Sequence, residues 1–394
     1  MGHDSISAEL RRIQDAGLYR SLRRVESDQG PILLLDGREV INFSSNNYLG
    51  LANHPELCLA AKEAIDRYGC GSGASRLISG NMALHEELES KIAELKGTEA
   101  ALVFNSGFQA NTGILATLAG EGDVVFSDAL NHASIIDGCR LSRAQLAVYG
   151  HCDMEQLERG LKDAPHQSRK LIVTESLFSM DGDEAPLMEI VSLAEEYGAE
   201  VMVDEAHATG VYDPNGAGLV AKLELSDRVL VQMGTLGKAL GGFGAYVAGS
   251  RALRELLINR CRSFIFTTAL PPAVMAMGIA AIDLVMREPE RRQALWSNRE
   301  RLKMGLTELG YSLGQSRSQI LPLMIGDPTR CMKLSEAALE RGVFAQGIRP
   351  PTVPPGTSRL RITVMATHRL EHIEQALETF KDLKQDDDAF LRRT

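Results

Sequence analysis

Short apolar runs alternate with stretches of helical periodicity through the middle of the chain. Between about residues 53 and 285, the runs predict strands at Ala101–Phe104, Val124–Ser127, Gln145–Tyr149, Leu171–Glu175, Val201–Asp204, Val229–Met233 and Ala245–Ala248. The stretches between them predict helices at Pro55–Tyr68, Leu84–Leu95, Phe108–Ala119, Met154–Lys162 and Leu187–Tyr197. Strands that are apolar throughout, alternating with helices, indicate a mostly parallel sheet covered by helices on both faces.

The pattern differs on either side of this region. Before it, a helix is predicted from Ser5 to Gly17, and a hairpin at Pro31–Ile41 turns at Asp36-Gly37. After Pro271-Pro272, a long helical stretch reaches about Gly310. Strand and helix then alternate over Ile320–Ile325, Thr329–Arg341, Val343–Ile348, Leu360–Val364 and Arg369–Leu383. We therefore expect an N-terminal segment (1–52), a large domain (53–285) and a smaller C-terminal α/β domain (286–394).

Composition narrows the classes of function. The 394 residues include 42 Lys+Arg and 52 Asp+Glu, a formal net charge of −10, which argues against general nucleic-acid binding. Hydrophobic residues make up 44% and charged residues 24%, as in ordinary globular proteins. The 36 glycines are about 9% of the 394 residues, above the usual ~7%. This excess indicates tight turns or a backbone close to a ligand.

The cysteine spacing argues against a metal site, and the hydropathy argues against a membrane or secreted protein. The six cysteines include no C-x-x-C pair, which argues against a disulfide framework and a Cys-built zinc site, so no metal is expected. No stretch approaches the ~18 consecutive apolar residues of a membrane span, and the N-terminus lacks the apolar core of a signal peptide. We expect a cytoplasmic protein without a membrane partner.

Two polar groups follow predicted strands, where α/β sheets bind ligands. Asp204 ends one strand and His207 follows it; these residues are either a helix cap with a solvated histidine or an acid and imidazole beside a cofactor ring. Lys238 lies in a Gly-rich, apolar segment after the next strand. Most lysines are solvated, but these flanks favour a buried amine with a lowered pKa, suited to a Schiff base.

Two Gly-containing segments are weaker signals. Ser106-Gly107-Phe108 joins a strand to a helix, so it is either a plain turn or an anion site at the helix N-terminus. The segment Cys70–Arg76 is glycine-rich, but it lacks the G-x-G-x-x-G spacing and no strand precedes it.

As a set, the segments from Gly17 to Leu383 resemble the α-oxoamine synthases, fold-type I enzymes that use pyridoxal 5′-phosphate (PLP) to condense an amino acid with an acyl thioester. The matching segments are Asn42–Leu51, Phe104–Asn111, Asn131–Ser134, Glu175–Asp183, Asp204–His207 and Thr235–Lys238. The resemblance implies a seven-stranded, mostly parallel sheet in the large domain, a smaller C-terminal domain and a homodimer.

Within the family, the segment Ile348–Pro354 is most similar to members that join L-alanine to a pimeloyl thioester and release CO₂ and the thiol. The acyl donor would be pimeloyl-coenzyme A or pimeloyl-acyl-carrier protein. Alternatives are a member that uses glycine and another acyl-CoA, an aminotransferase, or a non-catalytic family member.

The resemblance also implies roles for single residues. Lys238 would bond the cofactor, Asp204 would pair with its ring nitrogen and His132 would stack on the ring; these three are the expected catalytic residues. The expected cofactor-binding residues are Gly107, Phe108, His132, Ser179, Asp204, His207, Thr235, Lys238, Thr267 and Thr268, the last two from a segment that reaches the partner subunit. The expected substrate-binding residues are Arg20, Asn47, His132, Thr352 and Arg361, with Arg361 on the amino-acid carboxylate.

Overall fold

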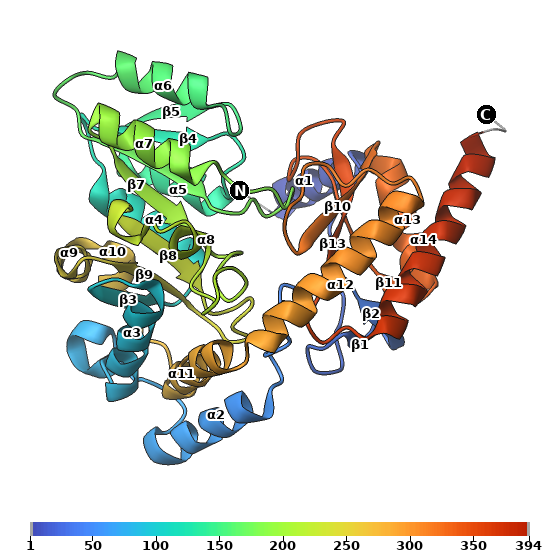
Figure 1. Ribbon diagram of the computed structural model, residues 1–394, viewed down its shortest axis with the longest axis horizontal. Coiled ribbons are helices and arrows are strands. Elements are labelled where there is room, and N and C mark those ends of the chain that lie inside the picture. The colour runs from blue at the N-terminus through green and yellow to red at the C-terminus, as the bar shows by residue number, and fades with distance from the viewer. Residues whose placement is uncertain (1–2, 392–394) are drawn as a thin grey trace.

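A seven-stranded sheet forms the centre of the larger part of the molecule in the computed structural model, which describes residues 3–391 (Figure 1). The strand order is β3-β9-β8-β7-β6-β4-β5, and only β9 runs antiparallel to its neighbours, β3 and β8. The strands are β3 (Ala100–Phe104), β4 (Val124–Asp128), β5 (Gln145–Tyr149), β6 (Lys170–Glu175), β7 (Glu200–Asp204), β8 (Val231–Thr235) and β9 (Ala245–Gly249). The predicted fold class is confirmed.

Helices cover both faces of this sheet because its strands are apolar on both sides. One face packs against α4 (Gly107–Leu118), α5 (Ala133–Ser142), α9 (Arg251–Arg260) and α10 (Arg262–Ile265). The other packs against α3 (Ala83–Lys96), α6 (Met154–Asp163), α7 (Leu187–Tyr197), α8 (Leu219–Lys222) and α11 (Pro272–Arg287). Met202 of β7 lies in the first apolar cluster, and Val201 and Val203 lie in the second, as the alternation of strand side chains requires.

Two further sheets build the smaller part of the molecule. β10 (Ile320–Gly326), β13 (Ser358–Thr363) and β12 (Gln346–Ile348) form an antiparallel sheet. The N-terminal hairpin, β1 (Ile32–Leu35) and β2 (Arg38–Asn42), pairs with β11 (Val343–Phe344). The hairpin is thus joined to the C-terminal region, a contact the sequence did not predict. The domain boundaries themselves stay a prediction.

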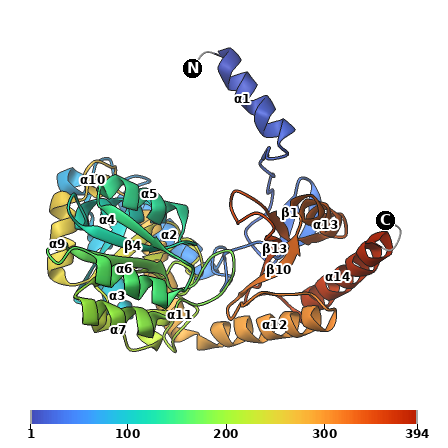
Figure 2. The ribbon, with the colours of Figure 1, turned by 90° about the horizontal axis from the view of Figure 1, so that it is seen from above.

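The remaining helices connect or cover these sheets. They are α1 (His3–Asp15), α2 (Pro55–Tyr68), the π-helical turn η1 (Arg76–Gly80), the 3₁₀ turn η2 (Ser226–Arg228), α12 (Pro289–Glu308), α13 (Pro328–Glu340) and α14 (Leu370–Leu391). Helix α12 runs from the larger part to the smaller, and α1 projects away from both (Figure 2). Within residues 3–391, no helix combines the length and apolar character needed to cross a bilayer.

The predicted elements differ from the structure in three ways. The long helix after Pro272 is two helices, because Pro289 lacks the N–H that would continue the first and instead starts the second. The predicted strand Val343–Ile348 is two strands, because the chain passes from one sheet to the other at Ala345. Helices α5, α8, α9 and α10 were not predicted; they are short or contain polar residues that interrupt the apolar pattern, and packing against the sheet stabilises them.

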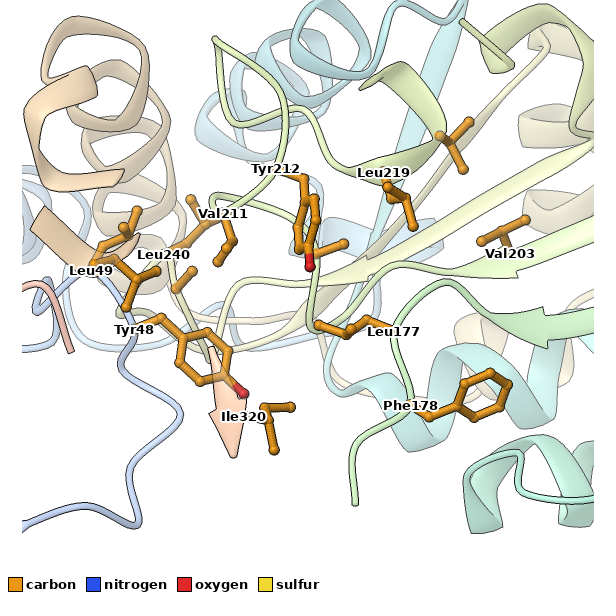
Figure 3. Packing of buried hydrophobic residues seen from close by; sticks show 14 of the residues in the cluster. Tyr48, Leu49, Leu177, Phe178, Val203, Val211, Tyr212, Leu219, Leu240 and Ile320 are labelled. Atoms are coloured by element: carbon orange, nitrogen blue, oxygen red, sulfur yellow. The ribbon is translucent and has the colours of Figure 1, made fainter. Parts of the chain in front are cut away.

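The main apolar cluster extends from the large sheet into the smaller part of the molecule. It includes Val203 and Leu177 from the large-sheet region, Tyr48 and Leu49 from the N-terminal segment, and Ile320 of β10. Figure 3 shows Tyr48 between Leu49 and Ile320. One continuous core therefore fixes the two parts relative to each other around the carboxyl ends of the large-sheet strands.

Candidate active site

Asp204 is held at the carboxyl end of β7 by two neutral donors. It is buried, and its Oδ2 accepts a hydrogen bond from Asn111 Nδ2 of α4 at 2.8 Å. Its Oδ1 accepts one from the backbone N–H of Ala206 at 2.9 Å. These two bonds fix the orientation of the carboxylate.

Lys238 and His207 form a contact pair beside this carboxylate. Lys238 Nζ lies 2.8 Å from His207 Nε2, and His207 Nδ1 lies 2.7 Å from the hydroxyl of Tyr48. Burial holds the pKa of His207 well below its usual value, and the charges of Lys238 and Arg361 act in the same direction. The imidazole is therefore neutral, and Nε2 can accept a hydrogen bond from the ammonium form of Lys238.

The turn that carries Lys238 needs glycine. Gly241 donates its N–H to the Lys238 carbonyl at 3.0 Å and has a φ of 65°. A Cβ at Gly241 would lie 2.5 Å from the backbone nitrogen of Ala52, so no other residue fits this close approach. The Gly-rich segment thus packs the lysine turn against the N-terminal segment.

The surroundings of Lys238 favour the neutral amine. Burial lowers the pKa of Lys238 to about 8, Arg361 acts in the same direction, and Asp204 and Glu175 oppose it. An amine with this pKa is available without its proton in a useful fraction near neutral pH, as Schiff-base chemistry and general-base catalysis require.

His132 is connected to Asp204 through two side chains. Asn111 Nδ2 donates to Ser134 Oγ at 2.9 Å as well as to Asp204, and Ser134 Oγ lies 2.8 Å from His132 Nδ1. The backbone N–H of Ser134 also donates to this Nδ1, at 3.2 Å. Because Nδ1 accepts both bonds, the proton of the neutral ring lies on Nε2. The imidazole itself is exposed.

Glu175 ends β6 beside Asp204 in the sheet. It is buried, and its Oε1 has no hydrogen-bond partner among residues 3–391. Burial, together with the Asp204 charge, raises the pKa of Glu175 to about 8. This carboxyl group is therefore mostly protonated at neutral pH.

The predicted anion-binding residues lie around the start of α4. Gly107 and Phe108 open this helix, and Ser106 caps it by accepting a hydrogen bond from the Gln109 N–H at 3.2 Å. Thr267 and Thr268 lie against Asn105 of the same chain, whose Nδ2 donates to Thr267 Oγ1 at 3.2 Å and to the Thr268 carbonyl at 2.9 Å. Their predicted reach into a partner subunit stays a prediction.

Thr235 ends β8, on the strand next to Asp204. Its hydroxyl donates to the Gly244 carbonyl at 2.9 Å and accepts from the Gly237 N–H at 3.1 Å. Thr235 therefore stabilises the turn that carries Lys238, in addition to any contact with an anion.

Arg361 of β13 reaches the large-sheet side of the molecule. Its Nε donates to the Ser179 carbonyl at 2.6 Å, and its Nη2 donates to Asn46 Oδ1 at 3.2 Å and to the Tyr48 hydroxyl at 3.5 Å. Its side chain is buried. Arg361 thus faces the predicted site, and Ser179 meets it through its backbone.

Arg359, two residues earlier, is also buried and forms an ion pair with Asp181. Neither arginine is therefore a solvated charge at the edge of its strand. Both point toward the loop of residues 179–181, because alternate residues of a strand share a face.

Two of the expected substrate-binding residues, Arg20 and Thr352, line a separate cavity. Arg20 Nη2 donates to Thr352 Oγ1 at 3.4 Å, and both residues line a cavity of about 410 Å³. Gln346 also lines it and is the sheet partner of Arg361, so the cavity and Arg361 occupy adjoining strands.

Asn47 is turned toward its own backbone. Its Oδ1 accepts from the N–H groups of Leu51 and Ala52 at 2.8 and 3.1 Å, and its Nδ2 donates to the Gln29 carbonyl at 3.2 Å. Its role in substrate binding stays a prediction.

Three site residues were missed: Tyr48, Asn111 and Glu175. Each lies in a segment that carried the family resemblance, but none was given a role. Glu175 had a usable signal, because it ends a predicted strand as Asp204 does. The partners of Tyr48 and Asn111 are 159 and 93 residues away, and no local pattern reports such contacts.

The fold and this group of residues define a class. A family model for class I and II aminotransferases matches residues 38–380, and the chain belongs to that family. Within it the chain belongs with the 8-amino-7-oxononanoate synthases. It is 54% identical to that enzyme from Geobacter sulfurreducens, over 95% of this chain and 96% of the relative. It is 52% identical to that of Symbiobacterium thermophilum, over 96% of each.

Solved structures agree with the fold. The serine palmitoyltransferase of Sphingomonas wittichii superposes with a TM-score of 0.93 at 34% identity, covering 98% of each chain. An SPT structure with a PLP internal aldimine gives 0.92 at 35% identity over 97% of each chain. The 8-amino-7-oxononanoate synthase of Francisella tularensis gives 0.77 at 28% identity, covering 88% of this chain and 98% of that one.

PLP is the cofactor of this family, and the donor set of this chain fits it. A helix N-terminus at Gly107 suits a phosphate, the Asp204 carboxylate suits a protonated pyridine and the Lys238 amine suits an aldehyde. The buried Oδ1 of Asn111 is also without a hydrogen-bond partner among the described residues, beside Asp204.

Proposed function

We propose that the protein catalyses the condensation of L-alanine with a pimeloyl thioester, giving 8-amino-7-oxononanoate, CO₂ and the free thiol. The observation that carries this proposal is the Lys238–His207 pair, 2.8 Å apart beside Asp204, in a chain 54% identical to a synthase of that name. The cofactor-binding and catalytic roles assigned from the sequence are part of the proposal.

Bound PLP supplies an electron sink for negative charge at the amino-acid Cα. Lys238 holds the cofactor, and its amine afterwards takes the proton from the alanine Cα. Asp204 stabilises a protonated ring nitrogen, and His132 packs on the ring. Gly107, Phe108 and Thr235 would hold the phosphate together with Thr267 and Thr268. Ser179 and His207 would lie beside the phenolic oxygen.

Arg361 binds the alanine carboxylate. A guanidinium can hold a carboxylate with two parallel hydrogen bonds, which would orient the Cα–H bond for proton removal. Its bond to the Ser179 carbonyl fixes its direction before the substrate arrives.

The acyl chain occupies the cavity lined by Arg20 and Thr352. Apolar side chains of Leu22, Met332 and Phe344 share this lining with Arg20, which suits a chain with a charged terminus. The substrates are L-alanine and this acyl chain, whose thiol carrier is coenzyme A or acyl-carrier protein.

A homodimer is part of the proposal. Phe266 is 72% exposed and directly precedes Thr267 and Thr268, which the family resemblance places in the segment that reaches the partner subunit. Light scattering on the purified protein tests the dimer, and fractionation of expressing cells tests the expected cytoplasmic location.

Product analysis tests the reaction. The purified protein with PLP is offered alanine, glycine or serine together with pimeloyl-CoA, pimeloyl-acyl-carrier protein, acetyl-CoA or palmitoyl-CoA. The proposal expects equal release of CO₂ and thiol with alanine and a pimeloyl donor only. Turnover restricted to glycine with another acyl-CoA would instead support the alternative family activity, and the serine–palmitoyl pair tests the activity named for the solved relatives.

A further inference from the structure

The hydroxyl of Tyr48 contacts both His207 and Arg361 of the candidate site. This hydroxyl lies 2.7 Å from His207 Nδ1, accepts from Arg361 Nη2 at 3.5 Å and donates to Asn46 Oδ1 at 3.1 Å. His207 in turn contacts Lys238. One phenol therefore stands between the group proposed to bind the substrate carboxylate and the group proposed to move the proton.

The phenol is held rigidly. Tyr48 is fully buried in the main apolar cluster, next to Ile320 of β10 (Figure 3). Burial raises the pKa of Tyr48, although the Arg361 charge lowers it, so the hydroxyl keeps its proton. Because the hydroxyl gives its one proton to Asn46 Oδ1, it accepts a hydrogen bond from the N–H at Nδ1 of His207, and this leaves Nε2 free to accept from Lys238.

The geometry points to Tyr48 as a positioning residue that couples Arg361 to the His207–Lys238 pair. This inference rests on the proposed function. Through Asn46 and Arg361 the hydroxyl is fixed in place, and through Nδ1 it fixes the plane of the His207 imidazole that meets Lys238. A carboxylate bound by Arg361 would therefore affect Lys238, although Arg361 lies in β13 and Lys238 lies in the turn after β8 of the large sheet.

Other titratable and charged groups also face this pair, and a test must distinguish their effects from that of Tyr48. Asp204 and Glu175 end the neighbouring strands, His132 lies across from them, and Arg361 comes from β13. None of these is removed by Tyr48→Phe, which retains the buried ring and deletes only the hydroxyl.

A double-mutant cycle on the holoenzyme tests the coupling. Alanine is titrated into the wild type, Tyr48→Phe, Arg361→Lys and the double variant, and the cofactor absorbance is followed. We expect Tyr48→Phe to weaken alanine binding about fivefold in the wild type but less than about twofold in the Arg361→Lys background. Equal factors in both backgrounds would overturn the coupling.

The matched control is Tyr212→Phe. Tyr212 is likewise buried, and its hydroxyl donates to Glu184 at 2.9 Å, away from His207 and Lys238. We expect it to change alanine binding by less than about twofold in both backgrounds. An effect as large as that of Tyr48→Phe would reduce the role of Tyr48 to packing.

A pH titration separates this inference from the proposed function. Without any amino acid, the absorbance of the Lys238-bound cofactor is followed against pH, and Tyr48→Phe should shift its midpoint by about half a unit or more while Tyr212→Phe does not. An unshifted midpoint overturns the positioning role. A wild type that fixes no cofactor on Lys238, or that ignores alanine, overturns the proposed function instead.

Discussion

Lys96 and Lys238 are two buried lysines of the same α/β core whose pKa values are shifted in opposite directions. Lys96 of α3 is fully buried and forms an ion pair with Glu205, while also donating to the Ala217 carbonyl. Burial by itself lowers the pKa of Lys96, but the Glu205 carboxylate more than offsets this, and the pKa lies above its usual value. Lys96 is therefore a permanent cation.

Lys238 meets a neutral imidazole where Lys96 meets a carboxylate. Burial lowers its pKa to about 8, and Asp204 and Glu175 do not reverse this effect. The comparison shows that the partner in direct contact, rather than burial alone, decides whether the pKa of a buried lysine is raised or lowered.

The neighbouring carboxylates of Asp204 and Glu205 differ in the same way, because one contacts the fold and the other faces the site. Glu205 Oε1 accepts from the N–H groups of Leu219 and Val220 at 2.6 and 2.9 Å, so both of its oxygens serve the fold. Asp204 faces the site between Asn111 and the lysine turn. Glu205 thus anchors the segment that presents Asp204 and His207.

The largest expected effect is on catalysis. Lys238→Ala should lower the rate of condensation by on the order of 10³-fold or more, because it removes the amine that holds the cofactor and moves the proton. Turnover is measured beside borohydride reduction, which should fix PLP on the wild-type peptide that contains Lys238. Lys62→Ala, an exposed lysine, is the control; label on a different lysine would contradict the assignment.

Lys96→Met should instead act on stability. Removing one partner of a fully buried ion pair leaves Glu205 uncompensated and should cost about 3–5 kcal/mol of unfolding free energy. Urea denaturation measures it. Lys96→Met with Glu205→Gln should recover part of the loss, and a single variant as stable as the wild type would contradict a structural role.

Arg361→Lys should weaken alanine binding by about 1–3 kcal/mol, because a lysine keeps the charge but not the two-pronged donor. The nearby Arg359→Lys disturbs the ion pair between the buried Arg359 and Asp181, and should lower stability while leaving alanine affinity nearly unchanged. Spectral titration with alanine and urea denaturation separate the two. Equal losses of affinity at both positions would remove the carboxylate site from Arg361.

The smallest effect sharpens the comparison of the lysines. The pKa of Lys238 is about 8 in the folded protein and 10.5 ordinarily. Below pH 8 the buried ammonium therefore destabilises the folded state, and the free energy of unfolding should rise between pH 8 and 10.5. In the cofactor-free protein, Lys238→Met should therefore stabilise by about 1–2 kcal/mol at pH 7, and less as pH approaches 10.5. Urea denaturation at several pH values measures this; destabilisation as large as for Lys96→Met would refute the contrast.

The sequence by itself determined most of the elements and singled out the turn that carries Lys238. Apolar runs gave the strands of the large sheet, helix α2 begins and ends where its periodicity predicts, and Asp204, His207 and Lys238 were recognised from their places after strands. These features are local: side-chain period, turn residues and polar groups at strand ends are all written within a few neighbouring positions.

Only the tertiary structure decided which distant groups meet. It brought the hydroxyl of Tyr48 to His207, turned Arg361 onto the Ser179 carbonyl and joined the N-terminal hairpin to β11. It also buried Arg359, which its local sequence marks as a surface charge. Such contacts depend on how separate elements pack around one core, and a side chain's partner 159 residues away leaves no trace in the periodicity of its own segment.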